Sequence, residues 1–189
     1  MNAAWKVEDN LSVEEYLKGE ELSDIRHEYI GGRVYAMPGV TIAHNTISLS
    51  LASTLGTHLR GGPCRVFIEG VKAHLRSIGQ EIFYYPDVMV ACDGRDMHRL
   101  FREYPKLIFE ILSESTEKSN RFEKFHNYIQ IETLEEYVLV AQDKFEVTVY
   151  RRVNNWKAEL FTNPKEEVEL KSVGLRMPMS EIYDQVSFP

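Results

Sequence analysis

The spacing of apolar positions changes several times along the chain, and each spacing predicts one kind of element. Between residues 41 and 60 apolar residues recur at every fourth position, which predicts an amphipathic helix. Other stretches alternate or are continuously apolar, and continuous runs are typical of central strands that are covered on both faces. The strand-like runs are 27–30, 33–36, 65–68, 71–76, 82–92, 107–113, 136–140, 145–150 and 156–161.

Short signals indicate where several elements begin and end. Ser12 followed three residues later by Glu15 is a capping-box pattern, which predicts a short helix over residues 12–17. Gly31-Gly32 separates two strand-like runs and predicts a two-residue hairpin turn. A terminal helical turn is expected over residues 180–183.

A second long helix is predicted from an N-cap at Ser115 or Thr116 to about Gln130. The apolar residues expected on its buried side are Phe122, Phe125 and Ile129. With the order hairpin, helix, strands, helix, strands, the sequence predicts an α/β or α+β fold with a mixed sheet flanked by two main helices. The absence of repeats and linkers predicts a single domain over residues 1–189.

Composition narrows the class of protein. The 189 residues are 43% hydrophobic and 27% charged, which is typical of a globular domain. The N-terminus has no basic segment followed by an apolar stretch, and no apolar run is long enough to span a bilayer. Cys64 and Cys92 lack the paired spacing of a zinc or redox motif. We therefore expect a cytoplasmic protein with two reduced, partly buried thiols.

Net charge bears on the kind of partner. A charge of −7 argues against a nucleic-acid ligand, because such binding usually needs a basic surface. Eight acids and two basic residues between positions 8 and 28 account for −6 of that charge, however. The rest of the chain is close to neutral, which leaves room for a local basic groove.

Two acids interrupt apolar runs, where an ionised side chain is costly unless it serves a purpose. Strand geometry places Asp87 on the same face as Met89, and Glu110 on the same face as Ile108 and Leu112. If the two strands are neighbours, both carboxylates point into one cleft, where oxygen ligands suit Mg²⁺ or Mn²⁺. Lys124 lies on the following predicted helix, from which an ammonium group can reach such a site.

The sequence also resembles a known group of enzymes. Pro86-Asp87, then Glu110 and a nearby lysine, is similar to the PD-(D/E)xK motif of restriction-endonuclease-like nucleases. Over about residues 12–150 the chain resembles a large bacterial family of that fold. The segments that carry this wider resemblance are His27–Arg33, Met37–Gly39 with His44, Tyr85–Val88, Glu110–Thr116, Lys124–Tyr128 and Glu136–Val140.

The resemblance implies a restriction-endonuclease-like mixed sheet and a Mg²⁺ site made by Asp87, Glu110 and the Ile111 carbonyl. It also implies that Glu28 is a further ligand or a base acting through water. The residue two positions after Glu110 is Leu112, so the motif lysine is not on the strand, and Lys124 takes its place. The family usually has an acid and an arginine before this lysine, whereas this chain has Asn120-Arg121.

The implied activity is hydrolysis of DNA phosphodiester bonds. Because cutting both strands of a duplex commonly requires two active sites, we expect a homodimer or higher homo-oligomer. Two other classes stay open: a catalytically silent binding or assembly module of the same fold, and a metal-free glycosidase that uses Asp87 and Glu110 as acid and base. The ordinary reading of His44 is a hydrogen-bonded histidine. Scattered surface charges that could line a phosphate groove are Lys72, Arg76, Arg95 and Arg99.

Overall fold

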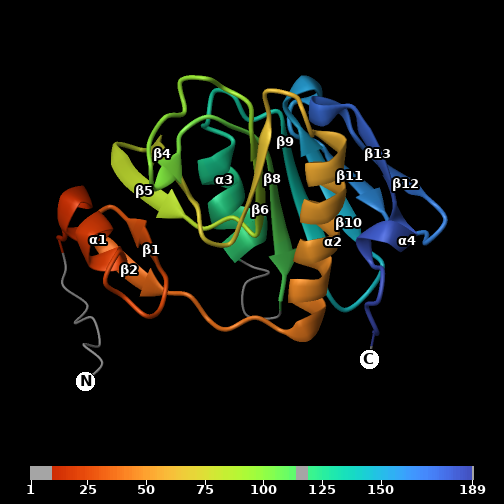
Figure 1. Ribbon diagram of the computed structural model, residues 1–189, viewed down its shortest axis with the longest axis horizontal. Helices are drawn as coiled ribbons and strands as arrows, with labels where there is room; N and C mark the ends of the chain where they lie inside the picture. Colours follow the sequence, from red (N-terminus) through yellow and green to blue (C-terminus); the bar gives the residue numbers. More distant parts are fainter. Residues whose placement is uncertain (1–9, 114–118, 189) are drawn as a thin grey trace.

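Two mixed β-sheets and a separate hairpin make up the strands in the part of the chain that the computed structural model describes, residues 10–113 and 119–188 (Figure 1). The first sheet has the order β2-β1-β5-β4-β7, made of β1 His27–Ile30, β2 Arg33–Ala36, β4 Lys72–Ser77, β5 Gln80–Tyr84 and β7 Phe101–Arg102. The second has the order β11-β10-β9-β8-β6-β3, made of β3 Arg65–Ile68, β6 Val88–Ala91, β8 Pro105–Leu112, β9 Glu136–Ala141, β10 Val147–Arg151 and β11 Ala158–Phe161. The hairpin pairs β12 Glu167–Leu170 with β13 Leu175–Pro178. The predicted mixture of strands and helices is confirmed.

The centre of the second sheet aligns the strands that carry the two candidate acids. β6 and β8 are antiparallel, with Val88 opposite Phe109. Asp87, just before β6, is therefore level with Glu110 on β8. β8 in turn runs parallel to β9. The neighbouring strands on which the two-acid hypothesis depends are present.

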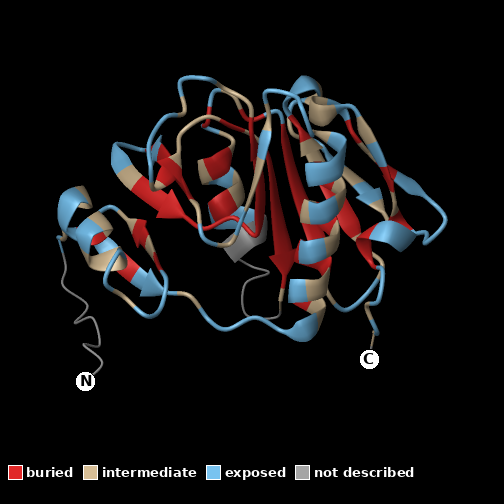
Figure 2. Cartoon of the chain, viewed as in Figure 1, coloured by how far each residue is buried: buried red, intermediate tan, exposed pale blue. Residues whose placement is uncertain are grey.

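Helix α2 (Ile42–His58) covers one face of the second sheet (Figure 2). Its fourfold apolar repeat is fully buried, whereas the opposite side of the helix faces solvent. The repeat packs against the strand residues that point to the same side, and together they form the largest core. Members of this core include Ile47, Leu51, Leu55, Val88, Val90, Leu107, Phe109 and Ile111.

A second core lies between the two sheets, on the other face of β8. A π-helical turn, η1 (Ser119–Lys124), leads into the short helix α3 (Phe125–Tyr128), whose Tyr128 is fully buried there. Residues from both sheets complete this core: Ala73, Leu75, Ile82 and Tyr84 from the first, and Met89, Ile108, Leu112, Tyr137 and Leu139 from the second. The lysine of η1 and the acid of β8 are thus on the same side of the sheet.

The N-terminal elements follow the sequence signals closely. Ser12 Oγ accepts the Glu15 amide of α1 (Val13–Glu20), and the Glu15 carboxylate accepts the Ser12 amide, so the capping box is confirmed. Gly31 and Gly32 have φ values of 54° and 96°, which a two-residue hairpin of this kind requires. The predicted turn between β1 and β2 is confirmed.

Two elements differ from the prediction. Residues 82–92 are not one strand: β5 ends at Tyr84 in the first sheet, and β6 begins at Val88 in the second. Pro86 lies at the break and has no N–H to donate to a ladder. In the described residues, the predicted long helix to about Gln130 is the π-helical turn η1 followed by the four-residue helix α3. Phe122, predicted to be buried, is 62% exposed. A π-helical turn holds more residues than an α-helical one, so Lys124 rather than Phe122 points inward.

The C-terminal elements are a short 3-10 turn η2 (Arg152–Asn154), a second one η3 (Lys171–Val173) and the helical turn α4 (Met179–Ile182). The strands predicted within residues 145–150 and 156–161 are present as β10 and β11, which pair antiparallel, and the predicted terminal turn is confirmed. The hairpin β12–β13 was not predicted. None of the helices in the described ranges has the length and apolar character needed to cross a bilayer.

Cys64 and Cys92 form a disulfide, so the prediction of two reduced thiols is wrong. The antiparallel register of β3 and β6 places Arg65 opposite Ala91, which brings the adjacent cysteines to a Cα separation of 4.0 Å. They are 28 positions apart in the chain, so their spacing in the sequence does not predict the bond. Because disulfides are rare in reducing compartments, the argument for a cytoplasmic location loses one of its supports.

Reduction of this disulfide is expected to lower the free energy of unfolding by about 3.5 kcal/mol, because the bond closes a loop of 28 residues in the unfolded chain. The corresponding fall in the melting temperature is roughly 10 °C. Thermal unfolding with and without reductant measures it. A Cys64→Ala/Cys92→Ala variant should match the reduced protein and ignore reductant, whereas identical wild-type curves in both conditions would contradict the prediction.

Candidate active site

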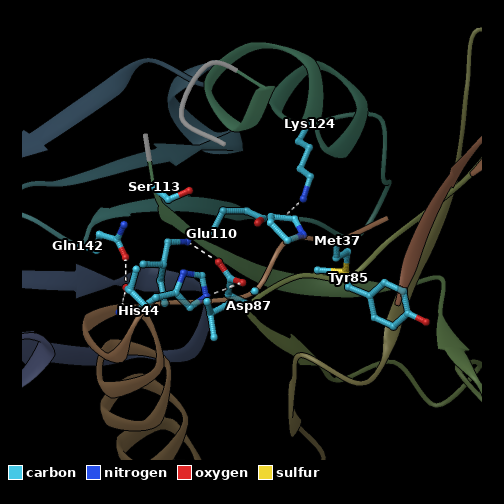
Figure 3. Close-up of a pocket in the computed structure, with 13 residues that line it drawn as sticks. Met37, His44, Tyr85, Asp87, Glu110, Ser113, Lys124 and Gln142 are labelled. Carbon is cyan, nitrogen blue, oxygen red and sulfur yellow. Dashed lines mark hydrogen bonds and ion pairs between the residues drawn. The ribbon is translucent and has the colours of Figure 1, made fainter. Parts of the chain in front are cut away.

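Asp87 lies where the chain passes from the first sheet to the second, and both of its carboxylate oxygens are engaged. Oδ2 accepts the Ile111 amide N–H at 2.6 Å, and Oδ1 lies 3.1 Å from His44 Nε2 (Figure 3). The residue is 7% exposed. A carboxylate that is ionised only accepts hydrogen bonds, so it pairs with the His44 tautomer that has a proton on Nε2. Asp87 is thus fixed in orientation from two sides.

The position of His44 follows from the start of α2. Thr41 is the N-cap, and its Oγ1 accepts the His44 amide at 3.1 Å. The cap begins the helix directly beside the strand ends, and the buried imidazole of the first turn reaches Asp87. The same Thr41 hydroxyl donates to Gln142 Oε1 at 2.6 Å, which ties the start of α2 to the loop after β9.

Glu110 is the more deeply buried acid, with 2% exposure on the inter-sheet face of β8. Its Oε1 accepts the Tyr128 hydroxyl at 2.9 Å and lies 3.4 Å from Lys124 Nζ. Burial raises the pKa of Glu110 to about 8; Lys124 opposes this rise, whereas the negative charges of Asp87 and Glu28 add to it. A neighbouring cation would therefore stabilise the ionised form of this carboxyl group.

Lys124 bridges the two sheets. Its Nζ lies 2.7 Å from Glu28 Oε1 on β1 and 3.4 Å from Glu110 Oε1 on β8, and 5.2 Å from the centre of the Tyr84 ring. Burial alone would lower the pKa of Lys124, but the carboxylates of Glu110 and Glu28 raise it above its ordinary value. Lys124 is therefore a cation at neutral pH. It can donate hydrogen bonds and stabilise negative charge.

These groups border a pocket of about 160 Å³ (Figure 3). The lining combines the two acids and the lysine with apolar residues of the connection from β2 to α2. The lining residues are Met37, Pro38, Gly39, Val40, Thr41, His44, Tyr85, Asp87, Glu110, Ile111, Ser113, Lys124 and Gln142. The pocket is thus amphipathic.

The structure brings together four of the side chains singled out in the sequence, namely Asp87, Glu110, Lys124 and Glu28. Ile111 lies there too, and its amide contacts Asp87. The side chains of Asn120 and Arg121, and the N-cap predicted at Ser115 or Thr116, lie outside the described residues.

The basic residues considered for a phosphate groove lie elsewhere. Lys72 is buried with its Nζ 5.0 Å from the Tyr85 ring centre, on the face of the first sheet that α1 covers. The other three form ion pairs with acids: Arg76 with Glu81, Arg95 with Asp93, and Arg99 with Glu21.

The sequence analysis did not identify two partners of the acids. His44 was expected to be a hydrogen-bonded histidine, and it is one, but its partner Asp87 was not predicted. The hydrogen bond from the Tyr128 hydroxyl to Glu110 was not predicted either. For Tyr128 a signal exists, because it lies four positions after Lys124 and so on the same helical side. For His44 the sequence offers only its place near a helix start.

The donor set bears on which metal would fit. Within the described ranges, no three His, Cys, Asp or Glu side chains gather closely enough to hold an ion by themselves. Zinc sites usually need three or four such ligands. Mg²⁺ commonly takes one or two carboxylates and completes its shell with water and substrate oxygens. Two buried carboxylates beside a backbone segment are a donor set of the kind that Mg²⁺ uses.

Comparisons with known proteins identify the family and the fold. Residues 13–180 match the family model Uma2, described as "Putative restriction endonuclease". Two proteins of Synechocystis sp., named "Uncharacterized protein slr1290" and "Uncharacterized protein sll1609", are 36% and 28% identical to this chain. The first match covers 94% of both chains, and the second covers 77% of this chain and 82% of its relative.

The fold is shared with a solved structure from Anabaena variabilis, described as "a putative nuclease belonging to DUF820". The two structures superpose with a TM-score of 0.76 over 94% of this chain and 99% of the other, at 20% sequence identity. This likeness supports the nuclease-like mixed fold that the sequence predicted. With the family match over nearly the whole length, it leads to one conclusion: the chain belongs to the Uma2 family of restriction-endonuclease-like proteins.

Proposed function

We propose that this protein is an endonuclease that hydrolyses DNA phosphodiester bonds with Mg²⁺ or Mn²⁺. The observation that carries the proposal is the buried pair Asp87, just before β6, and Glu110, level with it on the adjacent strand β8, with Lys124 beside Glu110. A glycosidase mechanism would use the two acids as acid and base but would give the buried lysine no role. Phosphodiester chemistry uses all three.

The metal ligands in this proposal are the carboxylates of Asp87 and Glu110 with the Ile111 carbonyl. When bound, the cation supplies an activated water and compensates charge on the phosphate. The raised pKa of Glu110 supports a cation site here, since a buried acid next to Asp87 is more easily ionised when a positive charge is near.

The chain's own residues then have distinct tasks. Asp87 is held in place by the Ile111 amide and His44, so a ligand oxygen is presented without rearrangement. Tyr128 holds Glu110 in the same way. Lys124 donates to a non-bridging phosphate oxygen and stabilises the charge that develops there. Glu28 keeps Lys124 oriented and can accept a proton through water.

Lys124→Met is expected to reduce metal-dependent cleavage at least about 10²-fold, because the charge-stabilising donor is lost. Mn²⁺ affinity, in contrast, should stay equal or increase, because the competing cation beside Glu110 is gone. Cleavage of plasmid and single-stranded DNA and calorimetric Mn²⁺ titration measure the two quantities.

Lys106→Met provides a matched control, because Lys106 pairs with Glu135 away from the pocket. It should leave both quantities unchanged. Cleavage that survives Lys124→Met at the wild-type rate would remove the role proposed for this lysine.

A catalytically silent binding module is the second candidate, and one observation favours it. The chain has a net charge of −7, and many surface cations are already paired with acids. Absence of cleavage in Mg²⁺ and Mn²⁺, together with metal-independent binding of a ligand in the pocket, would favour this candidate over the endonuclease.

A further inference from the structure

The geometry points to an unpaired DNA strand, rather than intact duplex, as the form of nucleic acid that reaches the pocket. This inference rests on the proposed function and specifies its substrate class. Three independent features carry it: the depth of the reacting groups, the segment that borders the pocket, and the pairing of the surface charges.

The groups that must meet a phosphate are deeply placed. Asp87, Glu110 and Lys124 are 7%, 2% and 9% exposed. A phosphate in a duplex belongs to a stiff rod, with a persistence length of about 150 base pairs, whose partner strand travels with it. A single strand bends freely and can lead one phosphate into a narrow pocket. The burial of the reacting groups therefore favours single-stranded DNA over duplex.

The segment of residues 37–41, called here the strap, lines the pocket. Met37, Pro38 and Val40 add apolar groups to the same lining that holds the acids and the lysine. Thr41 ends the strap and is tied across to Gln142 by a hydrogen bond of 2.6 Å. A nucleotide that leaves its stack offers a matching pair of surfaces, because its phosphate is charged and its base and sugar have apolar faces. A paired base keeps those faces inside the helix.

Surface charge points in the same direction. Duplex binding gains most of its affinity from free lysine and arginine side chains that displace counterions. In the described ranges many of these side chains are engaged with carboxylates: Arg26–Glu69, Arg76–Glu81, Arg95–Asp93, Arg99–Glu21, Lys106–Glu135 and Arg176–Glu169. Each engaged cation is less available to a phosphate backbone. Contacts inside the pocket then contribute more to the affinity for DNA than a basic surface does.

The test uses three oligonucleotides of one sequence: a single strand, a blunt duplex, and a duplex with a single-stranded tail. Cleavage is followed in Mn²⁺, and binding is measured by fluorescence anisotropy in Ca²⁺. We expect the single strand to be cut and bound at least about 10-fold better than the blunt duplex. Cuts in the tailed duplex should map to the tail.

A variant addresses the strap directly. Gln142→Leu removes the hydrogen bond to Thr41. This variant should cleave duplex faster relative to single strand than the wild type does, so the preference for single strand should decrease. Gln130→Leu, which loses only a contact to the His126 carbonyl, should not change the preference. Circular dichroism checks that both variants fold.

The outcomes distinguish the single-strand inference from the endonuclease proposal. Equal or faster cleavage of blunt duplex, or cuts inside the paired region, would overturn the inference and leave the endonuclease proposal standing. No cleavage of any oligonucleotide would contradict the endonuclease proposal, and the binding preference measured in Ca²⁺ would still decide the inference. Equal binding of single strand and duplex would overturn it.

Discussion

Asp87→Asn is expected to abolish measurable Mn²⁺ binding and to reduce DNA cleavage at least about 10³-fold. The change keeps the shape of the side chain and an oxygen for the Ile111 amide, but it removes the negative charge. Since the proposed site has only two carboxylates, the loss of one leaves too little charge to hold a divalent cation. Isothermal titration with Mn²⁺ and a cleavage assay measure the two effects.

Asp93→Asn is the matched control for this prediction. Asp93 lies just after β6, its carboxylate pairs with Arg95, and it is not among the pocket residues. This variant should bind Mn²⁺ and cleave DNA as the wild type does. Equal Mn²⁺ affinity in Asp87→Asn and wild type would show that the metal site lies elsewhere.

Arg151→Met is expected to lower the free energy of unfolding by about 3–5 kcal/mol. Arg151 is 2% exposed, and its Nε lies 2.7 Å from Glu136 Oε1 on the neighbouring strand. The guanidinium also binds Glu159 and the Glu169 carbonyl. Without it Glu136, which is 1% exposed, keeps only neutral donors from Lys171 and Ser172. Urea unfolding measures the loss.

Two further variants test the reason for that loss. Arg176→Met breaks an exposed pair with Glu169 and should cost less than about 1 kcal/mol. Glu136→Gln added to Arg151→Met should restore part of the stability, because the buried charge is no longer present. A loss below about 1 kcal/mol in Arg151→Met would mean that solvent reaches this pair.

Local signals predicted the elements well where one residue type has one physical use. Ser12 with Glu15 closes a capping box, and Gly31-Gly32 makes the β1–β2 turn, because few other residues satisfy these backbone demands. The fourfold apolar repeat of α2 was equally informative, since a long amphipathic helix has few competing explanations.

Where an apolar run serves two elements, the pattern alone did not separate them. Residues 82–92 look like one strand because both β5 and β6 are buried on both faces. Only Pro86 marks the change of sheet. Phe122 was placed inward by a period that holds for α-helices, and the π-helical turn η1 shifts that period.

The two acids and the lysine were predictable, since charged residues inside apolar runs attract attention and the motif resemblance orders them. Their partners were less so. His44 is 43 positions before Asp87, and nothing in the local sequence of either indicates the contact. The Cys64–Cys92 bond was missed for the same reason, because it follows from strand register and not from spacing.

The passage of the chain from one sheet to the other at residues 85–87 has a consequence for folding. Glu28 belongs to the first sheet and Glu110 to the second, and Lys124 meets both only when the two sheets have docked. Contacts between such distant parts of a chain form late, because loop closure must precede them. A partly folded or newly synthesised chain therefore lacks the assembled site, and any activity of this protein appears only with its complete tertiary structure.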